Sequence, residues 1–273
     1  MRIRRLGWAG IEIEHEGATI VIDAIRDVGG AREVVGPLRV DVVPPRAAGR
    51  VRAALVTHLH TDHADPGAIA DALAPDGVVL RPHPDGGAGP LEAAALAEAE
   101  QGLEALAQPV VALAPWERRE IGPLTVTALP AVDGFGDPQV GWHVAGGDAS
   151  LVHCGDTLLH GWWWSIVERL GAPDVALLPV NGAVIALPHR QPASTRPAVM
   201  TPEDAVVAAR ALRSTLVPIH DVGIDAPPRY VPIADPTARA VAAAEAAGVP
   251  IHVLGTGEEL ALDDVRQRVP ATR

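Results

Sequence analysis

Three histidines and an aspartate occupy four of the six positions from 58 to 63, directly after the apolar run Ala53–Val56. Neutral imidazole is the commonest metal-binding side chain near neutral pH, and carboxylate often joins it on the same ion. His58, His60 and Asp62 alternate with other residues, so an extended backbone would direct them to one side. A solvated, histidine-rich loop is the simpler interpretation. The spacing after a buried strand favours a metal site instead.

His63 breaks this alternation, so the chain must turn if His63 is to face the same centre. The pair Asp65-Pro66 predicts a turn, because it is typical of a helix N-cap followed by proline at the first helical position.

Two later segments end apolar runs with residues of the same type. Asp156 follows the run 150–152 at a turn opened by Gly155, although it could simply cap the next helix. His220 follows Leu216–Ile219, where a lone histidine is often a structural residue. Active sites gather where strands end, so three such strand ends together favour one site at a sheet edge.

The elements that must position these residues follow from hydrophobic patterning and from turn residues. Blocks of strands with helices on both sides predict an α/β layered sandwich, and no linker divides it, so we expect a single domain over residues 1–273. We expect helices over 66–73, 91–107, 202–213 and 236–247, with Asp65, Thr201 and Asp235 as N-caps. We expect strands over 2–6, 11–14, 19–23, 53–56, 78–80, 109–113, 124–129, 140–144, 150–154, 175–178, 216–219 and 251–254.

Composition limits the function. The 273 residues are 48% hydrophobic, which predicts a substantial core, and the net charge of −12 argues against a general nucleic-acid binder. The single cysteine, Cys154, fits a reducing compartment. We find neither a signal peptide nor 18 uninterrupted apolar residues, so we expect a cytoplasmic protein without a membrane span. A small-molecule substrate fits these features, and a homo-oligomer stays open.

The order His-x-His-x-Asp-His, then Gly-Asp-Thr, then Pro-Ile-His resembles the metallo-β-lactamase superfamily. The likeness is greatest to its branch of ascorbate-6-phosphate lactonase-like and N-acyl-phosphatidylethanolamine phospholipase D-like hydrolases. The opening Leu6–Gly10 and the strand end Ile22-Asp23 match that branch too. The resemblance covers about residues 3–255. It implies a four-layer αββα sandwich with a two-metal site at its edge.

The resemblance also implies a ligand set. His58 and His60 would bind metal 1, Asp62 and His63 would bind metal 2, Asp156 would bridge the two ions, and His220 would complete metal 2.

One position departs from the family pattern. Asp133 stands where the family usually supplies a histidine to metal 1. Asp133 could ligate as a harder oxygen donor, which would favour Mn²⁺, Fe²⁺ or Mg²⁺ over Zn²⁺. Alternatively, His160 could substitute, or metal 1 could be weak and the enzyme mononuclear. We take Asp133 as the expected ligand.

The chemistry expected of such a site is hydrolysis by a water that two divalent ions, zinc or manganese and less readily iron, hold between them. Asp62 and His63 would be the catalytic residues, with Asp62 orienting that water. The substrate would be a small ester, lactone or phosphodiester, or an amide.

Substrate-binding or supporting roles are assigned to His160, Trp162, His153, His189 and Arg190. Trp162 could line the pocket, and Arg190 could receive a carboxylate or phosphate. His153 could orient a ligand, or it could be a satisfied core histidine.

Two other function classes remain. The same scaffold with iron could carry out redox chemistry, which an oxygen ligand at Asp133 leaves open. A non-catalytic metal-binding or ligand-binding protein is the other.

Overall fold

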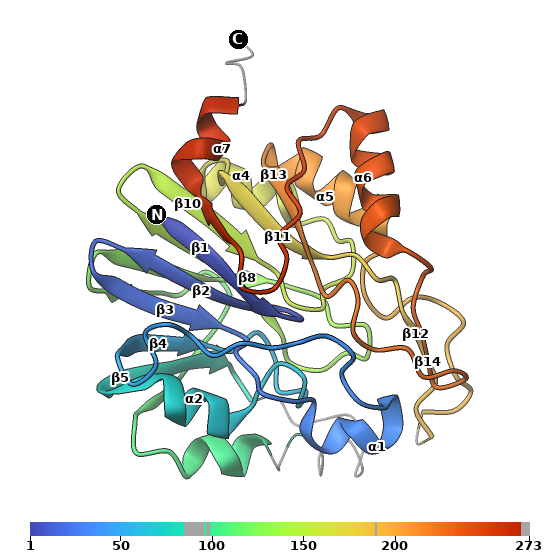
Figure 1. Cartoon of the computed structure of the whole chain (residues 1–273), viewed down its shortest axis with the longest axis horizontal. Coiled ribbons are helices and arrows are strands. Elements are labelled where there is room, and N and C mark those ends of the chain that lie inside the picture. Colours follow the sequence, from blue (N-terminus) through green and yellow to red (C-terminus); the bar gives the residue numbers. More distant parts are fainter. Residues whose placement is uncertain (85–95, 97–98, 189, 269–273) are drawn as a thin grey trace.

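Two large β-sheets stacked face to face form the centre of the molecule (Figure 1). The computed structural model describes residues 1–84, 96, 99–188 and 190–268. The first sheet has the order β15-β1-β2-β3-β4-β5-β6 and the second β13-β11-β10-β9-β8-β7. The first sheet contains β1 (Arg2–Gly7), β2 (Gly10–His15), β3 (Ala18–Ile22), β4 (Val51–Leu55), β5 (Leu73–Pro82), β6 (Val110–Leu113) and β15 (Glu259–Ala261). The second contains β7 (Arg118–Ile121), β8 (Leu124–Pro130), β9 (Val140–Gly146), β10 (Ala149–His153), β11 (Val175–Pro179) and β13 (Thr215–Ile219).

The helices lie outside the two sheets (Figure 1). They are α1 (Arg32–Val35), α2 (Pro66–Ala72), α4 (Trp163–Leu170), α5 (Pro202–Leu212), α6 (Pro236–Ala247) and α7 (Leu262–Arg268), with a 3-10 turn at Gly29–Ala31. A two-stranded ribbon, β12 (Val184–Ile185) with β14 (Tyr230–Val231), lies at the right-hand side of the view.

Three buried apolar clusters correspond to the three interfaces between four layers. The largest lies between the sheets and includes Trp8 and Trp142. A second joins the outer face of the second sheet to α4, α5 and α6 through residues such as Trp163. The third packs α2, through Ile69, against the outer face of β4 and β5. The predicted αββα sandwich is confirmed.

Two of the three predicted N-caps are confirmed. Asp65 Oδ1 accepts a hydrogen bond from the Ala68 backbone N–H (2.9 Å), and Thr201 forms a capping box at the start of α5. For Asp235 the predicted side-chain cap is wrong. Helix α6 begins at Pro236 as expected, but Asp235 has φ 48° and its side chain makes no cap hydrogen bond. A capping side chain requires the extended backbone that Asp65 and Thr201 adopt.

The predicted strand over 251–254 is wrong. Only Ile251 forms a bridge, with Leu216: the Leu216 N–H bonds to the Pro250 carbonyl and the His252 N–H to the Leu216 carbonyl, but the next ladder donor would be Pro218, which has no N–H. The last strand is β15, which pairs with β1 and was not predicted, nor were β7 and α7. Of the predicted helix 91–107, residues 99–104 are helical, and residues 91–95 and 97–98 lie outside the described residues.

Parallel pairing explains how distant segments reach one place. β3, β4 and β5 are parallel in the first sheet, and β10, β11 and β13 are parallel in the second. The carboxyl ends of parallel strands meet at one edge, so the loops that follow them converge there. Within the described residues, no helix is both long and apolar enough to cross a membrane.

Candidate metal centre

The structure gathers the seven predicted ligands into two groups. His58, His60 and Asp133 form group 1, and Asp62, His63, Asp156 and His220 form group 2. Within each group one possible ligand atom per residue lies within 4.8 Å of the others. The imidazole rings of His58 and His63, one from each group, are 4.2 Å apart, so the two groups adjoin.

Group 2 takes two ligands from the turn after β4 because that turn begins earlier than predicted. The His60 carbonyl accepts hydrogen bonds from the backbone N–H groups of His63 and Ala64, both at 2.9 Å. The extended run therefore ends at His60 and does not continue to Asp62. This one helical turn separates Asp62 from His58 and His60 and brings it beside His63.

Asp156 is central to group 2. Its two carboxylate oxygens lie 3.0 Å from His63 Nε2 and 3.1 Å from His220 Nε2. Asp62 Oδ2 is 3.7 Å from His63 Nε2 and 3.9 Å from His220 Nε2. Asp156 is not a member of group 1, so its role as a bridge between the two metal ions stays a prediction.

Trp8 supports two members of group 2. Its indole N–H donates to Asp62 Oδ2 (3.3 Å), and its ring lies 3.9 Å from the ring of His220. Its backbone carbonyl accepts from the His220 N–H (3.3 Å). His220 has φ 46°, an uncommon conformation for a non-glycine residue, and the ion pair of Asp221 with the buried Arg5 (2.5 Å) holds this turn.

Asp23, at the end of β3, orients histidines of both groups. Its Oδ2 accepts from His63 Nδ1 (2.8 Å) and from the Thr57 hydroxyl (2.7 Å), and its Oδ1 accepts from the Thr57 backbone N–H (2.8 Å). Thr57 Oγ1 is in turn 3.0 Å from His58 Nδ1. These contacts occupy the Nδ1 atoms of His58 and His63 and leave their Nε2 atoms for a metal.

The loop from Asp133 to Asp137 is arranged for a carboxylate ligand in group 1. Asp133 Oδ2 accepts from the backbone N–H groups of Phe135 (2.6 Å) and Asp137 (3.2 Å), which leaves Oδ1 for a metal. Asp137 Oδ2 is 2.9 Å from His60 Nε2, so His60 would ligate through Nδ1. The same loop thus supplies one ligand and orients another.

The hydrogen bonding of the buried ligand atoms shows that these residues fit divalent ions. The Nε2 atoms of His58, His63 and His220 and Oδ1 of Asp156 are buried and make no hydrogen bond of good geometry, although the Asp156 oxygens lie only 3.0 and 3.1 Å from His63 and His220. Buried polar atoms are nearly always satisfied, and each unsatisfied one costs about 1–3 kcal/mol. Four such atoms converge from three strand ends with an imidazole and carboxylate donor set, and this arrangement fits a bound divalent metal.

The charges within the site shift several pKa values. Burial lowers the pKa of His58 well below its ordinary value. Burial also opposes the charged form of His60, but its hydrogen bond with Asp137 and nearby carboxylates raise its pKa to about 9. Burial raises the pKa of Asp62. The neighbouring His63 and His220 lower it by more, so the pKa of Asp62 lies below its ordinary value. Asp62 is therefore ionised at neutral pH.

The remaining predicted residues have different positions relative to the two ligand groups. His160 belongs to neither group: its ring stacks on Trp163 at 4.0 Å, and its Nδ1 accepts from the Trp162 backbone N–H. The alternative in which His160 substitutes is thus not seen, whereas Asp133, the expected ligand, lies with His58 and His60. Trp162 is 47% exposed, and its place at the pocket stays a prediction. His189 lies outside the described residues.

His153 and Arg190 have contacts that support neighbours of the site. His153 Nε2 is 2.8 Å from the Ala9 carbonyl, and its Nδ1 accepts from the Gly155 N–H (3.3 Å), so it braces the turn that presents Asp156. Arg190 lies over the Phe135 ring, donates to the Phe135 carbonyl (2.7 Å) and is 3.7 Å from Asp137.

Sequence reasoning assigned no site role to Asp23, Asp137 or Trp8. A signal existed for Asp23, because it ends the strand that pairs in parallel with β4. Asp137 offered no such signal, since its partner His60 lies 77 positions away in the sequence.

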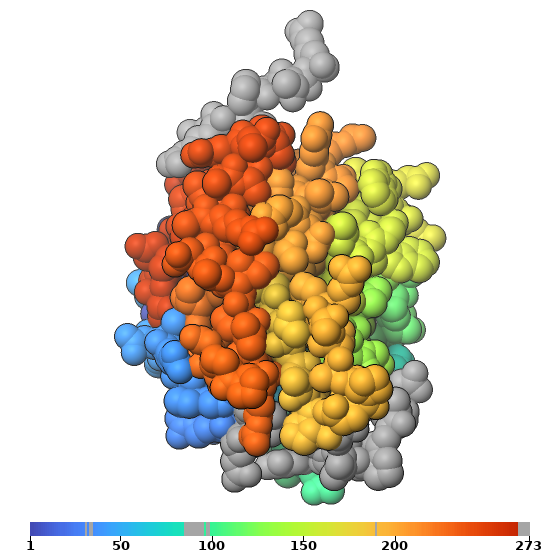
Figure 2. Space-filling view, turned by 90° about the vertical axis from the view of Figure 1, so that its right-hand side faces the viewer, coloured from blue at the N-terminus to red at the C-terminus, as the bar shows by residue number. Residues whose placement is uncertain are grey.

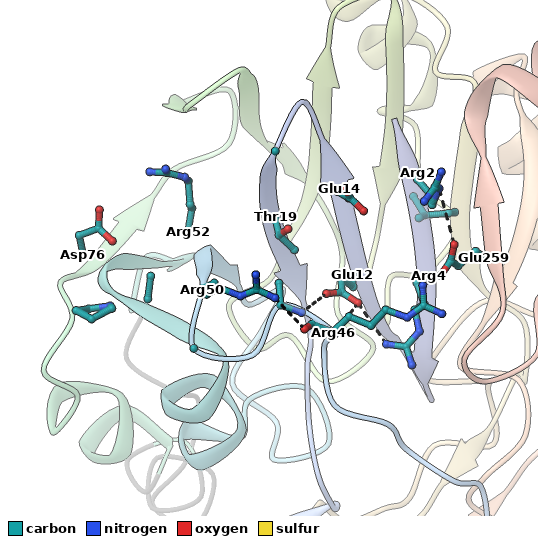
Figure 3. Close-up of a pocket in the computed structure, with 16 residues that line it drawn as sticks. Arg2, Arg4, Glu12, Glu14, Thr19, Arg46, Arg50, Arg52, Asp76 and Glu259 are labelled. Atoms are coloured by element: carbon teal, nitrogen blue, oxygen red, sulfur yellow. Dashed lines mark hydrogen bonds and ion pairs between the residues drawn. The ribbon is translucent and has the colours of Figure 1, made fainter.

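A cavity of about 610 Å³ lies elsewhere, on the outer face of β1, β2 and β3 (Figure 3). The residues that line it belong to neither ligand group. Its charges largely satisfy one another: Arg4 pairs with Glu12 (3.3 Å), and Arg2 pairs with Glu259 (3.8 Å). This groove is therefore not part of the metal centre.

Comparison with known proteins agrees with this geometry. The profile of the Beta-lactamase superfamily domain matches residues 18–220, which include all seven ligand positions. The chain belongs to the metallo-β-lactamase superfamily. It is 30% identical over 191 residues to the UPF0173 metal-dependent hydrolase MK1542 of Methanopyrus kandleri, covering 66% of this chain and 72% of the relative.

Solved structures share the fold. Igni18, a metallo hydrolase from Ignicoccus hospitalis, superposes with a TM-score of 0.64 at 19% identity, over 95% of this chain and 97% of that one. CmlA, a diiron β-hydroxylase from Streptomyces venezuelae, gives 0.65 at 17% identity, over 95% of this chain and 53% of that one. These two proteins of the same fold differ in their chemistry, so the fold does not choose between hydrolysis and oxidation.

Proposed function

We propose that this superfamily member is a binuclear metallo-hydrolase that cleaves a small ester, lactone or phosphodiester. The observation that carries the proposal is the convergence of unpaired buried ligand atoms from two adjoining groups. The metal-dependent hydrolase of Methanopyrus kandleri supports the reaction class. The substrate branch, the metal identity, the single domain and the cytoplasmic location all stay predictions.

The expected holders of the two ions are the residues of groups 1 and 2. Two bound divalent ions would supply Lewis acidity and lower the pKa of a water molecule. Asp62, ionised and fixed through the Trp8 indole N–H, presents a carboxylate that would orient that water. His63 is held by Asp23, so its Nε2 faces Asp156 and cannot turn away.

No protein nucleophile is needed. Cys154 is buried, and burial raises the pKa of its thiol to about 12, so it carries no thiolate at neutral pH. Water is therefore the nucleophile, and the products are an acid and an alcohol, or a phosphomonoester and an alcohol.

Replacement of Asp62 or His63 by alanine tests this proposal. We expect loss of hydrolysis by about 10²–10⁴-fold with the fold retained, because each residue contributes to proton transfer or binds the metal ions. The matched control is Asp76→Asn, an exposed carboxylate on β5. Elemental analysis should find two zinc or manganese ions per chain. Full turnover in either alanine variant would exclude the proposed chemistry.

An iron-dependent oxidase or hydroxylase is the second candidate, and Asp133 is the observation that favours it. A carboxylate in place of an imidazole makes group 1 a harder site, which suits iron as well as manganese. Iron-loaded protein that consumes O₂ with a reductant but hydrolyses no ester, lactone or phosphodiester would favour this candidate. Hydrolysis by zinc-loaded or manganese-loaded protein favours the first.

A further inference from the structure

Tyr230 is the only tyrosine of the chain, and its side chain is 3% exposed. It lies on β14, which pairs with β12 through Ile185 opposite Tyr230. In Figure 2 the segments around residues 180–200 and 220–240 lie side by side on one face, as this pairing requires. The ring packs in the cluster between the two sheets. The phenol oxygen is thus inside the protein, where it needs a polar partner.

That partner is Asn181, which donates from Nδ2 to the Tyr230 hydroxyl oxygen at 2.8 Å. The Asn181 amide is held in this orientation because its Oδ1 accepts from the Ala183 backbone N–H (3.2 Å). The phenol oxygen therefore acts as the acceptor in this bond. Its own proton has no acceptor among the described residues, so it can be donated to a bound molecule.

Sheet topology places Asn181 at the sheet edge that carries group 2. β11 lies between β10 and β13 in the second sheet, and Asn181 follows the carboxyl end of β11. Asp156 follows the end of β10, and His220 follows the end of β13. Since the three strands are parallel, Asn181 emerges between these two group 2 ligands.

The electrostatics agree with this placement. Burial and the negative charges of Asp156 and Asp62 raise the pKa of Tyr230 well above its ordinary value. The hydroxyl therefore keeps its proton at neutral pH and is a hydrogen-bond donor.

We propose that Tyr230 is a catalytic residue whose hydroxyl donates a hydrogen bond to the substrate oxygen that gains negative charge when water adds. This inference rests on the proposed hydrolytic function. The proton stays on the phenol throughout, so the step transfers neither a proton nor an electron. Such a donor stabilises charge that develops in the transition state, and Asn181 fixes it in advance. The fitting substrates have a carbonyl or phosphoryl oxygen, as esters, lactones and phosphodiesters do.

The decisive variant is Tyr230→Phe, which removes only the hydroxyl. With 4-nitrophenyl acetate and bis(4-nitrophenyl) phosphate as probes, we expect kcat to fall about 10²–10³-fold, the loss typical of one oxyanion donor. KM and the metal-to-protein ratio should not change, whereas a merely structural role would alter metal content or stability. The matched control is Val231→Ala, an exposed neighbour on the same strand, which should leave kcat unchanged.

A binding measurement keeps the inference separate from the proposed function. If the metal-loaded wild-type protein hydrolyses neither probe, the hydrolase proposal fails for these classes. Binding of orthovanadate, which resembles a charged transition state, then tests Tyr230 alone. We expect at least tenfold weaker binding to Tyr230→Phe. Equal kcat in both proteins, or equal vanadate affinity where neither hydrolyses, would overturn the inference.

Discussion

Replacement of Asp23 by asparagine should weaken metal binding although Asp23 belongs to neither ligand group. Three donors point at this buried carboxylate: the Thr57 N–H, the Thr57 hydroxyl and His63 Nδ1. An asparagine has the same size but only one accepting oxygen. In one amide orientation its NH₂ group, itself a donor, faces the Thr57 N–H. In the other orientation the NH₂ group faces the Thr57 hydroxyl and His63 Nδ1.

The magnitude follows from these contacts. Each donor left unpaired in the interior costs about 1–3 kcal/mol, so we expect the metal-free variant to lose about that much stability. The lost orientation of His63, and of His58 through Thr57, should lower metal affinity about 10–100-fold, or about 1.4–2.7 kcal/mol. Activity should fall in parallel.

The assay is competition between the protein and a chelator for Zn²⁺ or Mn²⁺, with urea unfolding of the metal-free protein measured separately. Asp27→Asn is the matched control, because Asp27 follows the same strand but is only partly buried and pairs at the surface with Arg32. Metal affinity within twofold of wild type, alongside the expected loss of stability, would show that Asp23 serves the fold alone and would refute the reasoning.

Three further predictions concern buried groups outside the ligand set. Asp221→Ala should lower the free energy of urea unfolding by about 3–5 kcal/mol, because it leaves the buried Arg5 guanidinium without its carboxylate partner. A loss below about 1 kcal/mol would contradict this. Burial lowers the pKa of His143 to about 4, so its unfolded form binds a proton below pH 6.5 before the folded form does. Stability should therefore fall by about 3 kcal/mol between pH 6.5 and 4 on its account, and His143→Phe should flatten that slope in unfolding measured against pH. Cys154 should react with a thiol reagent at pH 8 only after denaturation; rapid labelling of the native protein would disagree.

The sequence predicted the layered fold because hydrophobic patterning is a local property. Helix starts at Asp65 and Thr201 were found from side chains that bond to backbone groups within a few residues. Asp235 shows the limit, since its residue type suited a cap but its backbone adopted φ 48°. The strand pattern at 251–254 failed for a different reason: its partner strand β13 offers Pro218, which has no N–H, as the next ladder donor.

The sequence by itself determined which residue types could bind metal, since seven candidate ligands stand at strand ends and in a compact histidine motif. Tertiary structure decided how they divide into two groups, because the turn at His60 and the order of the parallel strands set which atoms meet. It also decided which residues hold them. Asp23, Asp137 and Trp8 come from loops and strands far apart in sequence, and only packing of the sheets brings them to the same edge.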